Sequence, residues 1–151
     1  MPTPDSGLHR ESCDIALCRD PEFKTFVRCT ALFDSGANLD CVSPATLQKL
    51  LKFYEGTPVV EVANSTLRFT QRPDGTCKDS TRVRRGIQFG RSSYSGSYQV
   101  IPVLIRMVLQ GVPLLMQLEL TEFNVNDEEI VFSKQTLIKY GLLSYMDDPL
   151  K

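Results

Sequence analysis

The sequence predicts a domain built mostly of β-strands, with two short helices. Residues 25–33 and 100–120 alternate apolar and polar residues or are continuously apolar, which is the pattern of half-buried and buried strands. Turn-forming sequences interrupt these segments, such as the Gln-Gly-Val-Pro within the second one. Residues 43–54 and 133–143 instead carry the capping residues and the apolar spacing of amphipathic helices.

The composition fits one folded domain. The chain has 151 residues, 42 % of them hydrophobic, which is sufficient for a single core. Its formal net charge of -1 gives no global attraction to nucleic acid or to an anionic membrane. No apolar run is long enough to cross a bilayer, and the first residues lack the pattern of a secretory signal. We therefore expect a soluble, cytoplasmic protein with no nucleic-acid partner and no membrane partner.

Cysteine and histidine usage limits the chemistry. Five cysteines occur, at positions 13, 18, 29, 41 and 77, and none forms a Cys-x-x-Cys pair. We expect reduced, mostly buried thiols rather than a disulfide framework or a zinc site. His9 is the only histidine and lies in a polar segment, which disfavours Ser-His-Asp, Cys-His and His-ligated metal chemistry. We expect no metal and no cofactor, and in an enzyme carboxylates would transfer the protons.

The first third of the chain predicts a hairpin that ends at an acidic turn. Residues 1–12 are polar and are expected to form a flexible leader. Residues 13–18 predict a short strand, 19–22 a turn and 23–33 the returning strand. That strand becomes fully apolar before it reaches Asp34. Because a buried carboxylate without partners is unfavourable, Asp34 is a candidate functional residue; the alternative is a surface Asx-turn that caps the strand.

The middle of the chain predicts a helix and two further hairpins. Ser43 is a good N-cap for the first helix, which follows a short strand. Residues 58–70 predict two strands about a turn at Ala63, Asn64 and Ser65. Residues 71–99 are the least regular segment, with five arginines among aromatic residues. Because the run is short and the whole chain is not basic, we expect a solvated, mobile hairpin. A local nucleic-acid contact is the alternative for that segment.

The last third is strongly patterned. Residues 100–120 predict a long hairpin, and residues 129–132 a short apolar strand. The second helix follows, with Ser133 as its N-cap and Gly141 at its end.

The region around Asp34 resembles retropepsins, the single-domain aspartic proteases of retroviruses and long-terminal-repeat retrotransposons. The match is carried by Ala-Leu-Phe-Asp-Ser-Gly-Ala at residues 31–37, followed by the helix, by Val-Ala-Asn-Ser at 62–65, and by the order hairpin, strand, helix at the end. The resemblance implies a closed β-barrel of the acid protease fold over residues 13–146, with a C-terminal tail at 147–151.

The resemblance also implies an aspartic endopeptidase that acts as a homodimer. This mechanism needs two carboxylates that share a proton, and the chain has one convincing Asp-Ser-Gly, so each subunit of a C2 dimer would contribute Asp34. Ser35 would donate its hydroxyl across the dimer, Gly36 would let the backbones approach, and Ala37 would line the site. The implied partners are a second copy of the chain and a polypeptide substrate.

In retropepsins a mobile hairpin, the flap, closes over the bound peptide. Two segments are candidates for this role. Spacing from Asp34 favours residues 60–70, which contain Ala63, Asn64 and Ser65, whereas a composition rich in glycine and serine favours residues 86–98. Both remain open.

The sequence departs from the retroviral pattern near the second helix. Phe132 stands where the family has Gly, Ser133 where many members have Arg, and Asn38 where the matching Asp would be. We expect a neutral contact between Asn38 and Ser133 in place of that ion pair. Phe132 and the long 71–99 segment favour an alternative function, a dimerisation or peptide-binding module with weak or no catalysis. An unrelated β-rich domain with an Asp-Ser-Gly turn is the third possibility.

Overall fold

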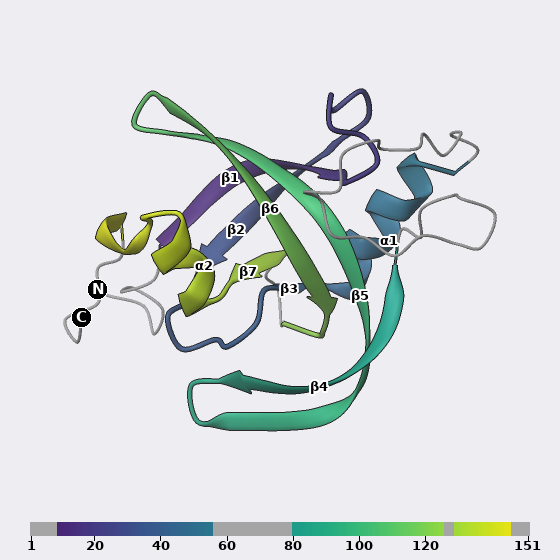
Figure 1. Cartoon of the computed structure of the whole chain (residues 1–151), viewed down its shortest axis with the longest axis vertical. Helices are drawn as coiled ribbons and strands as arrows, with labels where there is room; N and C mark the ends of the chain where they lie inside the picture. Colours follow the sequence, from purple (N-terminus) through teal and green to yellow (C-terminus); the bar gives the residue numbers. More distant parts are fainter. Residues whose placement is uncertain (1–8, 56–79, 126–128, 146–151) are drawn as a thin grey trace.

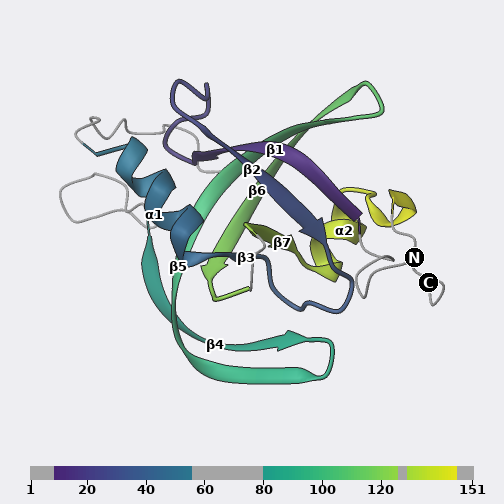
Figure 2. The same cartoon turned by 180° about the vertical axis from the view of Figure 1, so that it is seen from behind.

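The strands of the protein close into a six-stranded β-barrel (Figures 1 and 2). The structure is a computed structural model, and it describes residues 9–55, 80–125 and 129–145. Around the barrel the order is β1 (His9–Leu17), β2 (Val27–Phe33), β7 (Ile130–Phe132), β3 (Cys41–Val42), β6 (Val112–Glu122) and β5 (Ser92–Leu109). Strand β5 pairs back with β1 and closes the ring. Strand β4 (Thr81–Phe89) extends the sheet beyond β5 as an edge strand.

Strand β1 begins earlier than the sequence predicts. We expected residues 1–12 to form a leader, but residues 9–12 belong to β1, where His9 pairs with Phe33 of β2. The aromatic rings of this pair lie 5.1 Å apart. The start of β1 is therefore fixed by contacts with a distant strand, which the polar local sequence does not reveal.

Both predicted helices are present and begin at the predicted N-caps. Helix α1 (Pro44–Phe53) starts after Ser43, whose hydroxyl accepts the N–H of Thr46. Helix α2 (Lys134–Lys139) starts after Ser133, and Gly141 follows its end with a φ of 69°. A left-handed glycine just beyond the last turn is the usual end of a helix. Neither helix of the described chain is long and apolar enough to span a bilayer.

The β4–β5 hairpin is more regular than expected. The described part of the 71–99 segment forms a continuous antiparallel ladder, from Thr81 opposite Val100 to Phe89 opposite Ser92. Figure 1 shows this hairpin curving away from the barrel on the long strand β5. The predicted hairpin at residues 58–70 lies outside the described residues. The predicted 100–120 hairpin is present as β5–β6.

The main core fills the barrel. Phe33 and Phe132 are fully buried there, with their rings stacked 5.5 Å apart. A second apolar cluster, including Leu32, Ile87 and Val131, lies between the barrel and the β4–β5 hairpin. The four described cysteines are buried and free, as the sequence predicts.

Candidate active site

Asp34 lies directly after β2, at the point where β2, β7 and α2 meet. Its N–H donates to the carbonyl of Phe132 at 3.1 Å, which extends the parallel β2–β7 ladder by one residue. The N–H of Lys134, at the start of α2, donates to the carbonyl of Ala37 at 3.1 Å. The Asp-Ser-Gly-Ala loop is therefore fixed at both ends by the C-terminal part of the chain.

The interior of the loop is an Asx-turn. The carboxylate of Asp34 accepts the N–H of Gly36 at 2.9 Å, and its backbone carbonyl accepts the N–H of Ala37 at 3.2 Å. A Cβ atom added to Gly36 would lie 3.2 Å from Asp34 Oδ1 and 3.3 Å from the nitrogen of Gly90. This close approach explains why the position is glycine. The turn that the sequence offered as an alternative is thus part of the site geometry.

The β4–β5 hairpin packs on this loop, and hydrogen bonds from Asn38, here called the Asn38 latch, hold it there. The N–H of Gly90 donates to the carbonyl of Gly36 at 2.8 Å, and the N–H of Asn38 donates to the carbonyl of Gln88 at 3.1 Å. The Asn38 side chain adds two bonds, because its amide donates to the carbonyl of Gly86 at 3.1 Å and its Oδ1 accepts the N–H of Gln88 at 2.7 Å. Asn38 therefore pairs with β4 much as a short strand would.

The predicted loop residues differ in exposure. Asp34 and Ser35 are half-buried and Gly36 is exposed. Ala37 is 2 % exposed and forms a β-bridge with Phe89, so it packs under the hairpin.

Only one of the two flap candidates can be placed. Residues 86–98 form the outer part of the hairpin that covers the Asp34 loop of the same chain. The other candidate, with Ala63, Asn64 and Ser65, lies outside the described residues.

A cavity of about 240 Å³ lies beside Asp34. Aromatic residues form much of its wall: the Phe123 ring lies 5.5 Å from that of Phe89 and 5.0 Å from that of Tyr94. Among its described lining residues, Asp34 is the only carboxylate. The cavity therefore presents one acid beside aromatic side chains, with Ser92 and Asn124 also in its lining.

Asp40 is an acidic residue that sequence analysis did not single out. Its carboxylate accepts the N–H of Ser133 at 2.8 Å and the hydroxyl of Thr136 at 2.7 Å, at the start of α2. Burial raises the pKa of Asp40, while these two hydrogen bonds oppose the rise. One signal could have identified Asp40. The first N–H groups of any helix lack partners within the helix, so a helix start needs a nearby acceptor such as a carboxylate.

The contact expected between Asn38 and Ser133 is wrong. Asn38 bonds to β4, and the N–H of Ser133 is taken by Asp40. The acid that contacts the start of α2 is thus Asp40, two residues after position 38, where the family pattern places its Asp.

Phe132 belongs to the core and also supports the loop. Its side chain is fully buried against Phe33, while its carbonyl holds the N–H of Asp34. The bulky side chain therefore points into the barrel and leaves the loop joined to β7.

Metal-ligating clusters and reactive thiols are the two other kinds of centre to consider among the described side chains. Within residues 9–55, 80–125 and 129–145, no three His, Cys, Asp or Glu residues gather into a possible metal site. Burial raises the pKa of both Cys18 and Cys41 to about 12, so neither thiol is a ready nucleophile. Compared with known proteins, the chain matches no family model, no curated protein and no solved structure.

Proposed function

We propose that the protein is an aspartic endopeptidase of the retropepsin type. The observation that carries the proposal is the geometry of Asp34, a half-buried carboxylate directly after a barrel strand, in an Asp-Ser-Gly loop tied to β7 and α2. The carboxylate borders a cavity that is lined in part by aromatic side chains. In that position it can take a proton from a water molecule that attacks a peptide carbonyl.

The catalytic unit in this proposal is a homodimer with twofold symmetry. The reaction needs one ionised carboxylate to activate water and one protonated carboxyl group to donate to the scissile carbonyl. Since the described lining of the cavity holds only Asp34 as an acid, a second copy of the chain supplies the other. Gly36 is exposed, which suits the approach of two loops, and Ser35 donates its hydroxyl across the dimer axis.

The β4–β5 hairpin serves as the lid over the substrate. A peptide reaches Asp34 when the contact between Gly90 and Gly36 opens, because that contact closes the hairpin onto the loop. The same contact favours a second candidate function, a dimerisation or peptide-binding module with weak or no catalysis, since it keeps the loop covered within one chain.

Cleavage of a diverse peptide library between about pH 4 and pH 7, near and above the ordinary pKa of an aspartate, tests the proposal. The Asp34→Asn variant is assayed in parallel, with Glu22→Gln as the control because Glu22 is an exposed acid of the β1–β2 connection. We expect cleavage by the wild type and the control and none by Asp34→Asn. A stable dimer without cleavage would select the binding module, and a folded monomer under all conditions would contradict the protease.

A further inference from the structure

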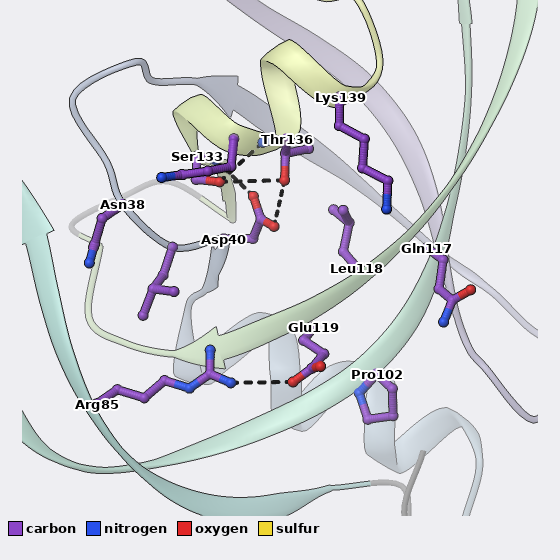
Figure 3. A pocket seen from close by; sticks show the side chains of 12 residues that line it. Asn38, Asp40, Arg85, Pro102, Gln117, Leu118, Glu119, Ser133, Thr136 and Lys139 are labelled. Atoms are coloured by element: carbon purple, nitrogen blue, oxygen red, sulfur yellow. Dashed lines mark hydrogen bonds and ion pairs between the residues drawn. The ribbon is translucent and has the colours of Figure 1, made fainter. Parts of the chain in front are cut away.

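A second cavity, of about 670 Å³, lies between α2, the 38–40 segment and one side of β5 and β6 (Figure 3). It shares no lining residue with the cavity at Asp34. Its volume falls within the range of about 300–1,000 Å³ usual for ligand pockets. Most of its lining side chains are polar, among them Gln117, Glu119, Gln135 and Lys139. The cavity therefore suits a polar ligand.

Strand β6 leaves one backbone position open toward this cavity. On the edge of β6 that faces away from β5, the N–H of Gln117 donates to the hydroxyl of Tyr140 at 3.1 Å. On the same edge the N–H of Thr121 donates to the carbonyl of Asp40 at 2.9 Å. Backbone groups along a strand alternate in direction, so the N–H and C=O of Glu119 point the same way, between these two contacts. No described residue hydrogen-bonds to them.

The residue opposite Glu119 agrees with this direction. Pro102 of β5 is its partner in the ladder, and a proline has no N–H to donate across it. Pro113 of β6 lies an even number of residues from Glu119, so it occupies the same kind of outward-facing position. The β5–β6 ladder thus does not depend on the N–H of Glu119.

The open position is short. Tyr140 occupies one end and the backbone of Asp40 the other. At about 3.4 Å per residue, the stretch from Gln117 to Thr121 measures about 14 Å, which leaves room for two or three extended residues. A chain end fits such a gap better than a strand that continues in both directions.

Lys139 supplies a positive charge at the Tyr140 end. The other charged groups of the cavity are engaged: Arg85 pairs with Glu119 at 3.2 Å, and Asp40 accepts two hydrogen bonds from α2. Lys139 Nζ lies 5.4 Å from the centre of the Tyr140 ring, and no described carboxylate forms an ion pair with it. Figure 3 shows the side chain extending from α2 over the cavity.

We propose that this cavity binds the carboxyl end of a short, extended peptide. The peptide main chain pairs with the N–H and C=O of Glu119, and the terminal carboxylate lies at Lys139. This site goes beyond the proposed hydrolysis, because it needs neither Asp34 nor a dimer.

The first test compares acetyl-Ala-Val-Ala as the free acid with its carboxamide, in titrations followed by amide NMR shifts. The Asp34→Asn variant is used as the background so that hydrolysis cannot consume the probe and so that failure of the proposed hydrolysis does not affect the result. We expect millimolar binding that moves the Gln117 and Glu119 signals, with the acid about three- to fivefold tighter because of a partly exposed ion pair. Lys139→Gln removes this preference. Lys134→Gln, on the same helix but outside the cavity lining, keeps it.

The second test separates the backbone contact from the side chain. Glu119→Pro removes the N–H that faces the cavity, and Glu119→Ala keeps it while losing the pair with Arg85. We expect Glu119→Pro to weaken binding about three- to tenfold, because the peptide loses one main-chain hydrogen bond, and Glu119→Ala to bind the peptide. If Glu119→Pro does not fold, the proposal is tested by Lys139→Gln and Lys134→Gln through their preference for the acid over the carboxamide. Absence of binding, equal binding of acid and carboxamide, or shifts confined to the Asp34 cavity would overturn the proposal.

Discussion

At Gly36 the backbone runs between the Asp34 carboxylate and the hairpin tip with no space for a side chain. We expect Gly36→Ala to lower the free energy of unfolding by about 1–2 kcal/mol, because both neighbours must shift. Gly86→Ala is the matched control, since the nearest atom to its added Cβ lies 3.9 Å away. Urea unfolding monitored by circular dichroism measures both. Equal stability of the two variants would show that the hairpin tip at Gly90 and the Asp34 side chain leave space for a Cβ atom at Gly36.

Asp40 makes folding depend on pH. Burial raises its pKa in the folded state above the ordinary value of 3.8, so between these two values the folded protein binds more protons than the unfolded chain. The contribution of this carboxyl to stability is therefore complete below about pH 3.8, the ordinary pKa that the group has in the unfolded chain. It is lost as the pH rises through the raised pKa of the folded state.

Asp40→Asn isolates this effect because an amide does not titrate. We expect the unfolding free energy of the wild type, minus that of Asp40→Asn, to fall between pH 4 and pH 7, approximately the window from the free-Asp value to neutrality. Urea unfolding at several pH values gives the difference, in which the other titrating groups largely cancel. A difference that rises with pH would mean that the hydrogen bonds from Ser133 and Thr136 outweigh burial.

At the scale of elements, the position of the β4–β5 hairpin depends on the Asn38 latch. Asn38→Ala removes two hydrogen bonds to β4 but keeps the backbone bond to Gln88. We expect local opening to become easier by about 1–2 kcal/mol, so that the amides of Gln88 and Gly90 exchange with solvent roughly 5- to 30-fold faster. Hydrogen exchange by NMR measures this. Ser93→Ala, an exposed change on the same hairpin, should leave exchange unchanged, and an equal effect of both variants would contradict the latch.

Strand β7 needs the bulk of Phe132. Because the side chain is fully buried and stacked on Phe33, we expect Phe132→Ala to cost about 3–5 kcal/mol of unfolding free energy. Phe132→Leu preserves most of the volume and should cost about 1.5 kcal/mol or less. Denaturant unfolding compares the two, and a loss below about 1 kcal/mol for Phe132→Ala would show that the ring does not support the core.

Local signals predicted much of the fold. Ser43 and Ser133 were identified as N-caps because a hydroxyl before an apolar-periodic segment is a local pattern. The start of β1 was missed because it is fixed by pairing with Phe33. Asn38 was given the wrong partner because that expectation came from the family pattern, whereas its actual partners lie on β4, 48 and 50 residues away. Likewise, the contacts of Asp40 with α2 join residues more than 90 positions apart. Such pairings depend on how the barrel closes, which no local pattern encodes.

For the whole molecule, barrel closure brings the Asp34 loop to the junction of β2, β7 and α2. The twofold arrangement and the cleavage remain predictions, since they rest on one acid per described site and on the Asp-Ser-Gly sequence. The dimer is the central claim, because without a second Asp34 the proposed proton sharing has no partner.

Subunit mixing tests this claim most directly. Wild type and Asp34→Asn are unfolded together, refolded at varied ratios and assayed for peptide cleavage at constant total protein. If each site needs one Asp34 from each chain, mixed dimers are inactive and activity follows the square of the wild-type fraction, or about one quarter at equal amounts. Activity that falls linearly, to about one half, would show that each chain carries its own complete site and would contradict the shared aspartate pair.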